Sequence, residues 1–186
     1  MTDNCVIIWQ KEVDSTNKEA ERRLCEGSVC DNLSVIAALS QTEGQGQGDH
    51  KWHSQPGANL TFTITVRYEN GFDASRQKEI SDLVAHSVMD YLATKGITSR
   101  IKLPNDIYVG DNKICGLLIR HHVRSGSIHH SIIGVGLNIN QTSFPDWIPN
   151  PTSIKLLTGK SCDDLQGELK EFINIFRNGL ERLLAE

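Results

Sequence analysis

The sequence of 186 residues predicts an α+β fold in which helices pack on a mixed β-sheet. Six segments rich in Ile, Val, Leu and Thr have the composition of strands, and three other segments repeat their apolar residues at helical spacing. Strands and helices do not alternate regularly, which disfavours a purely parallel α/β sheet. Hydrophobic residues make up 38% and charged residues 23% of the chain, as expected of one globular domain with a substantial core.

The expected strands cover residues 5–9, 33–39, 60–66, 99–102, 113–123 and 127–139. The expected helices cover residues 16–25, 74–94 and 163–184. The second helix should lie on the sheet through an apolar stripe made of Ile80, Leu83, Val84, Val88, Tyr91 and Leu92. Ser15 precedes the first helix, where it is expected to cap the first turn. Residues 124–127 have the composition of a hairpin loop, so the strands around them should be antiparallel.

Charge and composition exclude several classes of protein. The net charge of −4 disfavours a general nucleic-acid binder, which needs a basic face to neutralise phosphates. The first ten residues lack the basic and apolar regions of an export signal, and no apolar run reaches membrane-spanning length. Five cysteines without a Cys-x-x-Cys pair predict reduced thiols, and therefore a cytoplasmic location.

The segment 41–52 carries glycines at alternating positions, 44, 46 and 48. Without Cβ atoms, the backbone N–H groups of such a loop can face an anion. The spacing matches neither the phosphate-binding P-loop nor the dinucleotide fingerprint, so those two folds are disfavoured. A flexible surface loop explains the same composition equally well.

A second segment, 101–118, places a polar turn before a strand that begins near Lys113. The ammonium of a lysine can hold a carboxylate or a phosphate while charge shifts between them. A solvated lysine at a strand end is the ordinary alternative, and Asn105 with Asp106 is more often a turn pair.

The segment 131–140 is an apolar run interrupted by two glycines. Glycine in a strand lets a ligand approach the backbone, but it also marks an ordinary bulge. The group Asp14 to Asn17, at an expected junction of strand and helix, offers hydroxyl and amide groups suited to orienting a polar ring.

Two further features are interpreted as structural. The pairs His121-His122 and His129-His130 flank the expected hairpin, and because neighbours on a strand point to opposite faces, exposed histidines are favoured over a zinc site. Cys115 is interpreted as a buried thiol, because no base can be assigned to it.

Taken in order, these segments resemble the catalytic domain of biotin protein ligases. The family pattern contains Ser-Thr-Asn, Gln-Thr-x-Gly-Arg-Gly-Arg near a Lys-Trp, Gly-x-Asn-Leu, Lys-Trp-Pro-Asn-Asp, Lys-x-x-Gly-x-Leu and Gly-x-Gly-x-Asn. The corresponding positions are Ser15 to Asn17, Gln41-Thr42, Gly44 to Gly48 with Lys51-Trp52, Gly57 to Leu60, Lys102 to Asp106, Lys113 to Leu118, and Gly134 to Asn138. The resemblance covers about residues 13–158, and its strength lies in six ordered matches rather than in any single motif.

The resemblance implies a fold similar to class II aminoacyl-tRNA synthetases and a reaction in two steps. Biotin and ATP, with Mg²⁺, give biotinyl-5′-AMP and pyrophosphate, and a lysine of a biotin carboxyl carrier domain then takes the biotin. The whole chain, 1–186, would be the catalytic domain, without the small C-terminal β-barrel domain and the N-terminal DNA-binding helices of some relatives. No DNA or membrane partner is expected, and a homodimer is left open.

The resemblance also assigns roles to residues. Lys113 is the expected catalytic charge on the carboxylate and phosphate. The expected biotin-binding residues are Ser15, Thr16, Gln41, Gly44, Gly116, Leu118 and Gly134. The expected nucleotide-binding residues are Gln45, Gln47, Lys51, Trp52, Asn105 and Asn138, with Asp106 as a candidate link to magnesium.

The sequence departs from the family pattern at the loop, where Gln45 and Gln47 stand in place of arginines, and at Leu103, in place of tryptophan. A charge-assisted hydrogen bond contributes roughly 1.5–3 kcal/mol, so two lost arginines would weaken retention of the adenylate by about 10² to 10⁴ if the effects add. The two glutamines lead to one alternative, a catalytically weak, biotin-binding paralogue. A lipoate or octanoate ligase of the same fold family is the second alternative, against which Ser15-Thr16, Gln41 and the segment Lys113 to Gly116 favour biotin.

Overall fold

The computed structural model of the chain describes residues 5–28, 32–104 and 106–185. Within these ranges seven strands form one sheet in the order β1-β2-β3-β7-β6-β5-β4. The strands are β1 (Val6–Val13), β2 (Leu33–Gln41), β3 (Leu60–Asp73), β4 (Arg100–Lys102), β5 (Asp106–Val109), β6 (Asn112–Arg124) and β7 (Ser127–Leu137). β1 and β2 are parallel and the other neighbours are antiparallel, so the predicted mixed sheet is confirmed.

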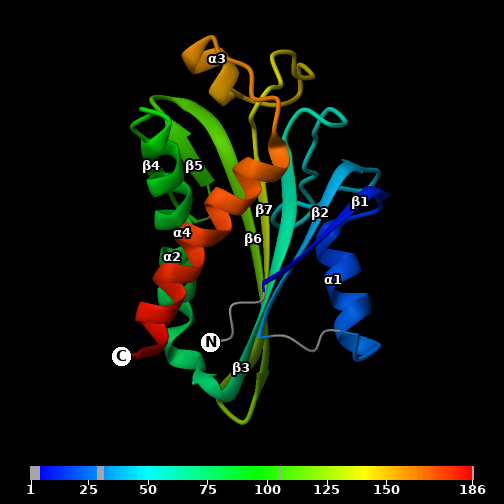
Figure 1. Ribbon diagram of the computed structural model, residues 1–186, viewed down its shortest axis with the longest axis vertical. Coiled ribbons are helices and arrows are strands. Elements are labelled where there is room, and N and C mark those ends of the chain that lie inside the picture. The colour runs from blue at the N-terminus through cyan, green and yellow to red at the C-terminus, as the bar shows by residue number, and fades with distance from the viewer. Residues whose placement is uncertain (1–4, 29–31, 105, 186) are drawn as a thin grey trace.

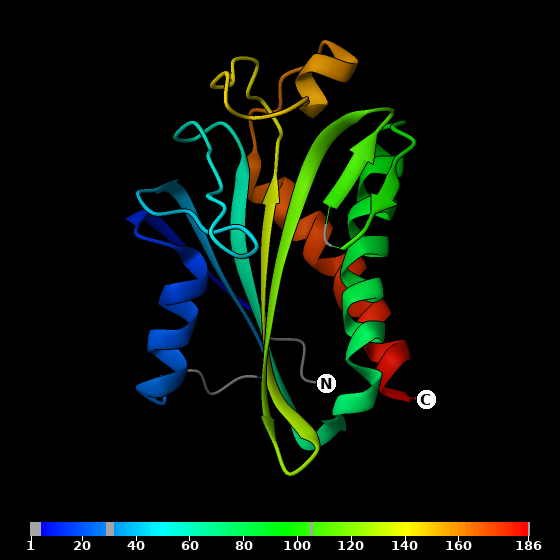
Figure 2. The same ribbon diagram turned by 180° about the vertical axis from the view of Figure 1, so that it is seen from behind.

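Helices cover both faces of the sheet (Figures 1 and 2). They are α1 (Thr16–Cys25), α2 (Gln77–Thr94), α3 (Ile154–Thr158) and α4 (Leu165–Ala185), and a 3₁₀ turn at Ala74–Arg76 leads into α2. Figure 2 shows α2 and α4 together on one face and α1 alone on the other. Within the described ranges, none of these helices combines the length and the apolar composition needed to cross a membrane.

Each face of the sheet has its own apolar core, because successive side chains of a strand point to opposite faces. On the face of α2 and α4, Phe62 of β3 meets Phe172 of α4 edge to face, with ring centroids 5.2 Å apart. Under α1, the smaller core joins Ala20, Ile36 and Ile132. The α1 face also carries buried polar groups, such as Thr63 and Asn17.

The predicted apolar stripe of α2 is confirmed. Its buried members are Ile80, Val84, Val88, Tyr91 and Leu92. The remaining member, Leu83, is partly buried and lies so close to Gly179 of α4 that a Cβ atom there would overlap it. The two helices therefore pack at short range on their side of the sheet.

The predicted hairpin between β6 and β7 is also confirmed. Ser125 and Gly126 both have a positive φ, 52° and 78°, as a two-residue turn of type I′ requires. The strands on either side pair antiparallel, and their register brings Gly116 opposite Gly136 and Leu118 opposite Gly134. This register places the two glycine-bearing segments side by side.

Some boundaries differ from the sequence predictions. β1 continues to Val13 and β3 to Asp73, past the expected ends at residues 9 and 66. β3 continues because, beyond a shift in register, Phe72 pairs again with Ile128 of β7. The strand β5 was not expected, since its first residue, Asp106, was interpreted as part of a turn. The short helix α3 was not expected either.

The predicted capping role of Ser15 was wrong. Ser15 occupies the N-cap position of α1, but its side chain makes no cap hydrogen bond. Instead the Ser15 N–H donates to the Asp14 carboxylate at 2.7 Å, and that carboxylate also accepts from Arg22. The Ser15 hydroxyl is therefore not committed to the helix.

Candidate active site

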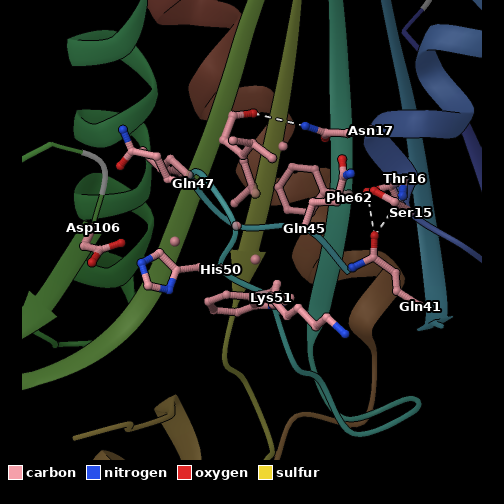
Figure 3. Close-up of a pocket in the computed structure, with 18 of the residues that line it drawn as sticks. Ser15, Thr16, Asn17, Gln41, Gln45, Gln47, His50, Lys51, Phe62 and Asp106 are labelled. Atoms are coloured by element: carbon pink, nitrogen blue, oxygen red, sulfur yellow. Dashed lines mark hydrogen bonds between the residues drawn. The ribbon is translucent and has the colours of Figure 1, made fainter. Parts of the chain in front are cut away.

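A cavity of about 250 Å³ lies on the α1 face of the sheet. It is bounded by the start of α1, the end of β2, the glycine-rich segment that follows β2, the first half of β6 and the end of β7. Figure 3 shows Thr16 and Gln41 on one side of this cavity and Asp106 on the other. Residues from both halves of the chain thus meet in one space.

One end of the cavity is a fixed array of polar groups. The Gln41 Oε1 atom accepts hydrogen bonds from the Thr16 N–H at 2.8 Å and from the Thr16 hydroxyl at 3.1 Å. The buried Thr63 hydroxyl lies 2.8 Å from the Thr16 hydroxyl and 2.6 Å from Asn17 Oδ1. Asn17 in turn donates to the Leu118 carbonyl at 3.2 Å. Because each group holds its neighbour, the array presents donors and acceptors in one arrangement.

The glycines of β6 and β7 form the floor of the cavity. A Cβ atom at Gly134 would overlap the Asn17 amide, and one at Gly136 would lie 2.6 Å from Trp52 Nε1. A Cβ atom at Gly116 would lie 3.0 Å from the same indole ring. Both strands keep a regular register here, so these glycines are not a bulge. They allow side chains to lie directly on the sheet.

The other end of the cavity carries charge. Lys113 Nζ and Asp106 Oδ1 form an ion pair at 2.6 Å, with 28% and 21% of their side chains exposed. The Lys113 ammonium also lies 5.8 Å from the centre of the Trp52 ring. The Lys113 backbone is fixed by the segment before α3, since its N–H donates to the Asn150 carbonyl at 2.7 Å and its carbonyl accepts from Thr152. A held, partly desolvated ammonium suits the binding of an anionic group.

The glycine-rich segment closes back on itself over the cavity. The Gly46 N–H donates to the His50 carbonyl at 2.8 Å, and the Trp52 N–H donates to the Gly44 carbonyl at 3.0 Å. Gln45 pairs with Lys51 as an isolated antiparallel bridge. These hydrogen bonds give the loop a defined shape and place Trp52 over the floor of the cavity.

A sequence model of the biotin/lipoate A/B protein ligase family matches residues 9–138. The chain belongs to this family. It is 31% identical over 160 residues to the bifunctional ligase/repressor BirA of Bacillus spizizenii. This match covers 84% of this chain and 48% of BirA. It is 33% identical over 141 residues to the chloroplastic biotin–protein ligase 1 of Arabidopsis thaliana, covering 72% of this chain and 36% of that one.

Solved structures of the family have the same fold. The biotin protein ligase of Aquifex aeolicus, in complex with biotin and ATP, superposes with a TM-score of 0.75 at 28% identity, over 95% of this chain and 71% of that one. The expected class of fold is therefore confirmed. The chain spans about half the length of the curated ligase/repressor relatives that it matches.

Most residues assigned to the site by the family resemblance lie together. Those that line the cavity are Ser15, Thr16, Gln41, Gln45, Gln47, Lys51, Trp52, Asp106, Lys113, Gly116, Leu118 and Gly134. Gly44, assigned to biotin binding, does not line the cavity, and a Cβ atom there would overlap the Trp52 carbonyl. Asn105 lies outside the described residues.

Asn138 does not line the cavity. It is buried, its Nδ2 donates to the Thr152 carbonyl at 2.9 Å, and its N–H donates to the Ile114 carbonyl at 3.0 Å. It ties the end of β7 to the segment that holds Lys113, so in this structure it supports the site from behind.

Several lining residues were not assigned from the sequence. They are Asn17, Gly46, His50, Phe62, Pro104, Leu117, Val135 and Gly136. Six of these residues lie within matched motifs, so the motifs themselves were the available signal: Asn17, Gly46, Pro104, Leu117, Val135 and Gly136. Phe62 carried no such signal, because its position beside the cavity depends on the pairing of β3 with β7.

The histidine pairs near the hairpin, expected to be exposed, are so only in part: His122 is exposed, whereas His121, His129 and His130 are partly buried. His121 Nδ1 lies 2.8 Å from the Ser131 hydroxyl, which is 3.1 Å from the Tyr68 hydroxyl. Within the described ranges no three His, Cys, Asp or Glu side chains gather as a metal site. Cys115 is fully buried, and burial raises the pKa of its thiol, which agrees with an inert side chain.

Proposed function

We propose that the chain is an ATP-dependent biotin protein ligase, which forms biotinyl-5′-AMP and transfers biotin to a lysine of a biotin carboxyl carrier domain. The observation that carries the proposal is that one cavity joins the polar array at Thr16 and Gln41 to the Lys113–Asp106 ion pair. Biotin has the matching shape, with a polar ring at one end and a carboxylate at the other. The Aquifex relative solved with biotin and ATP supports the same substrates.

The ring of biotin would lie at the polar end. Its ureido group has two N–H donors and one carbonyl acceptor, which need fixed partners once water is removed. Ser15, Thr16 and Gln41 provide hydroxyl and amide groups there, and the Gln41 oxygen is already held by α1. Gly116, Gly134 and Leu118 would line the slot for the thiophane ring and the aliphatic chain.

The carboxylate would then lie near Lys113, where the first bond is made. A carboxylate oxygen attacks the α-phosphorus of ATP, the bond to the bridging oxygen of the β-phosphate breaks, and pyrophosphate leaves. Negative charge is spread over the reacting phosphate in this step, so a nearby ammonium stabilises the transition state more than the separate substrates. Asp106, 2.6 Å from Lys113, would hold that ammonium in place before the substrates bind.

The nucleotide would occupy the space between the glycine-rich loop and Trp52. Trp52 offers a flat surface for the adenine, and Gln45, Gln47 and Lys51 face the same cavity. Magnesium would enter with ATP. Asp106 is the carboxylate among the described lining residues, and one carboxylate suits an ion held mainly by phosphates and water.

In the second step the amine of the carrier lysine attacks the carbonyl of the mixed anhydride. An amide bond forms, AMP leaves, and the amine loses a proton. The cytoplasmic location, the homodimer and the absence of a DNA partner stay predictions; the net charge of −4 is the observation that bears on DNA.

Exchange of labelled pyrophosphate into ATP tests the first step without any carrier. The proposal expects exchange that requires biotin and is lost in Lys113→Ala, but not in the exposed control Lys160→Ala. Exchange driven by lipoate or octanoate, and not by biotin, would favour the rival ligase. Biotin binding without exchange would favour the catalytically weak paralogue. The reason for considering that alternative is the pair of glutamines in the loop.

A further inference from the structure

Arg120 joins the glycine-rich loop to the rest of the site. It stands on β6 two residues beyond Leu118 and four beyond Gly116, and therefore on the face of the sheet that bears the cavity. Its Nη2 donates to Gln45 Oε1 at 3.1 Å, and its Nη1 donates to Glu21 of α1 at 2.9 Å. One side chain thus connects a strand, a helix and the loop.

The contact fixes the orientation of the Gln45 amide. A guanidinium has only donors, so it can meet only the oxygen of the amide. The Nε2 amino group must then point away from Arg120, and among the described residues it has no hydrogen-bond acceptor. Because Gln45 lines the cavity, this amino group is a donor available to a bound ligand.

The Glu21 contact does not by itself account for this arrangement. Both side chains are more than a third exposed, 39% for Arg120 and 36% for Glu21, and exposed ion pairs add little stability. The pair does restrain the guanidinium at the position where it meets Gln45. The positive charge of Arg120 at Gln45 Oε1 also polarises the amide, which strengthens its Nε2 group as a donor.

We propose that Arg120 is a positioning residue that holds Gln45 as a hydrogen-bond donor to the anionic part of the nucleotide or adenylate. This inference rests on the proposed function. Gln45 is one of the two positions at which the family pattern has arginine, so an arginine from β6 acting through a neutral amide would take over part of that task.

Binding of a non-hydrolysable ester analogue of biotinyl-adenylate tests the inference directly. Arg120→Met frees the Gln45 amide to rotate and should weaken analogue binding roughly tenfold, the effect of one hydrogen bond to a charged group. Arg120→Lys should recover most of the loss, because a lysine, like an arginine, has hydrogen-bond donors only and can still hold the Gln45 oxygen. Biotin alone should bind every variant equally, because the polar array at Thr16 is untouched. Arg124→Met, an exposed arginine at the end of the same strand, is the matched control.

A double-substitution comparison separates positioning from general support of the fold. In a Gln45→Leu background, where no amide is left to orient, Arg120→Met should cause no further loss of analogue binding. Gln45→Glu should keep the contact with Arg120 but turn an acceptor toward the ligand, and so weaken analogue binding while biotin binding is retained.

Three results overturn the inference. The first is that Arg120→Met binds the analogue within twofold of the unchanged chain. The second is that the double variant loses analogue affinity by the product of the losses of Arg120→Met and Gln45→Leu, and the third is that Arg120→Met loses biotin affinity to the same extent as analogue affinity. If the unchanged chain binds biotin but not the analogue, the proposed function fails first, and the inference fails with it.

Discussion

The Trp52 indole lies directly on Gly136 of β7, where a Cβ atom would come within 2.6 Å of the ring nitrogen. Gly134, two residues earlier on the same face, leaves room instead for the Asn17 amide. The two glycines thus serve opposite ends of one cavity. Gly134 belongs to the proposed biotin end and Gly136 to the proposed nucleotide end.

This difference predicts that alanine at the two positions has different effects. Gly136→Ala should displace Trp52 and raise the KM for ATP by about tenfold or more, whereas Gly134→Ala should chiefly raise the KM for biotin, since overpacking typically costs about 1–3 kcal/mol locally. Steady-state kinetics with each substrate varied in turn measure both. Equal effects of both variants on both substrates would contradict the proposed layout.

The contact between Thr16 and Gln41 predicts a second effect. Thr16→Val keeps the shape but removes the hydroxyl that bonds Gln41 and lies near Thr63, so biotin should bind about tenfold more weakly. Thr16→Ser keeps the hydroxyl and is the matched control. Calorimetric titration with biotin measures the change. If the valine variant binds biotin with unaltered affinity, the polar array does not bind biotin.

The loop predicts a gain as well as losses. Gln47→Arg should add a charge-assisted hydrogen bond at the cavity and slow the release of preformed adenylate by about tenfold to a hundredfold. A chase of labelled intermediate with unlabelled biotin measures the release rate. If the substitution leaves that rate unchanged, the glutamines are not the reason for any weak retention.

The start of α1 predicts a pH effect on stability. Hydrogen bonds from Arg22 lower the pKa of Asp14 from its ordinary value of 3.8 to about 2. A lowered folded-state pKa means that the stabilisation is complete above about pH 4 and is lost as the pH falls towards 2. The difference in Tm between the unchanged chain and Asp14→Asn should therefore shrink over that range. A constant difference down to pH 2 would show that the Asp14 charge does not matter.

The sequence predicted the long apolar elements well because their periodicity is a local property. It missed β5, a four-residue strand that begins at a polar residue and exists only because β4 and β6 lie beside it. It also predicted a cap hydrogen bond from the Ser15 side chain that is not formed, although Ser15 does occupy the N-cap position. The error at β5 concerns contacts made by the fold, which no local pattern in the segment reveals.

The candidate site was predicted through ordered motifs, and the motifs located most of the lining residues. They did not separate residues that face the cavity from those that support it, which is why Asn138 was assigned to the nucleotide. Arg120 lies outside the assigned positions, 75 residues from the loop that it contacts. The relationship is visible only in the folded chain, where the Arg120 side chain reaches Gln45.

The most direct test of the account is transfer of biotin to the lysine of an isolated biotin carboxyl carrier domain, with ATP and magnesium, followed by mass spectrometry of the carrier. The account predicts one biotin on the carrier, no transfer by Lys113→Ala, and normal transfer by Lys160→Ala. Transfer that persists without Lys113, or none by the unchanged chain although it binds biotin, would contradict it.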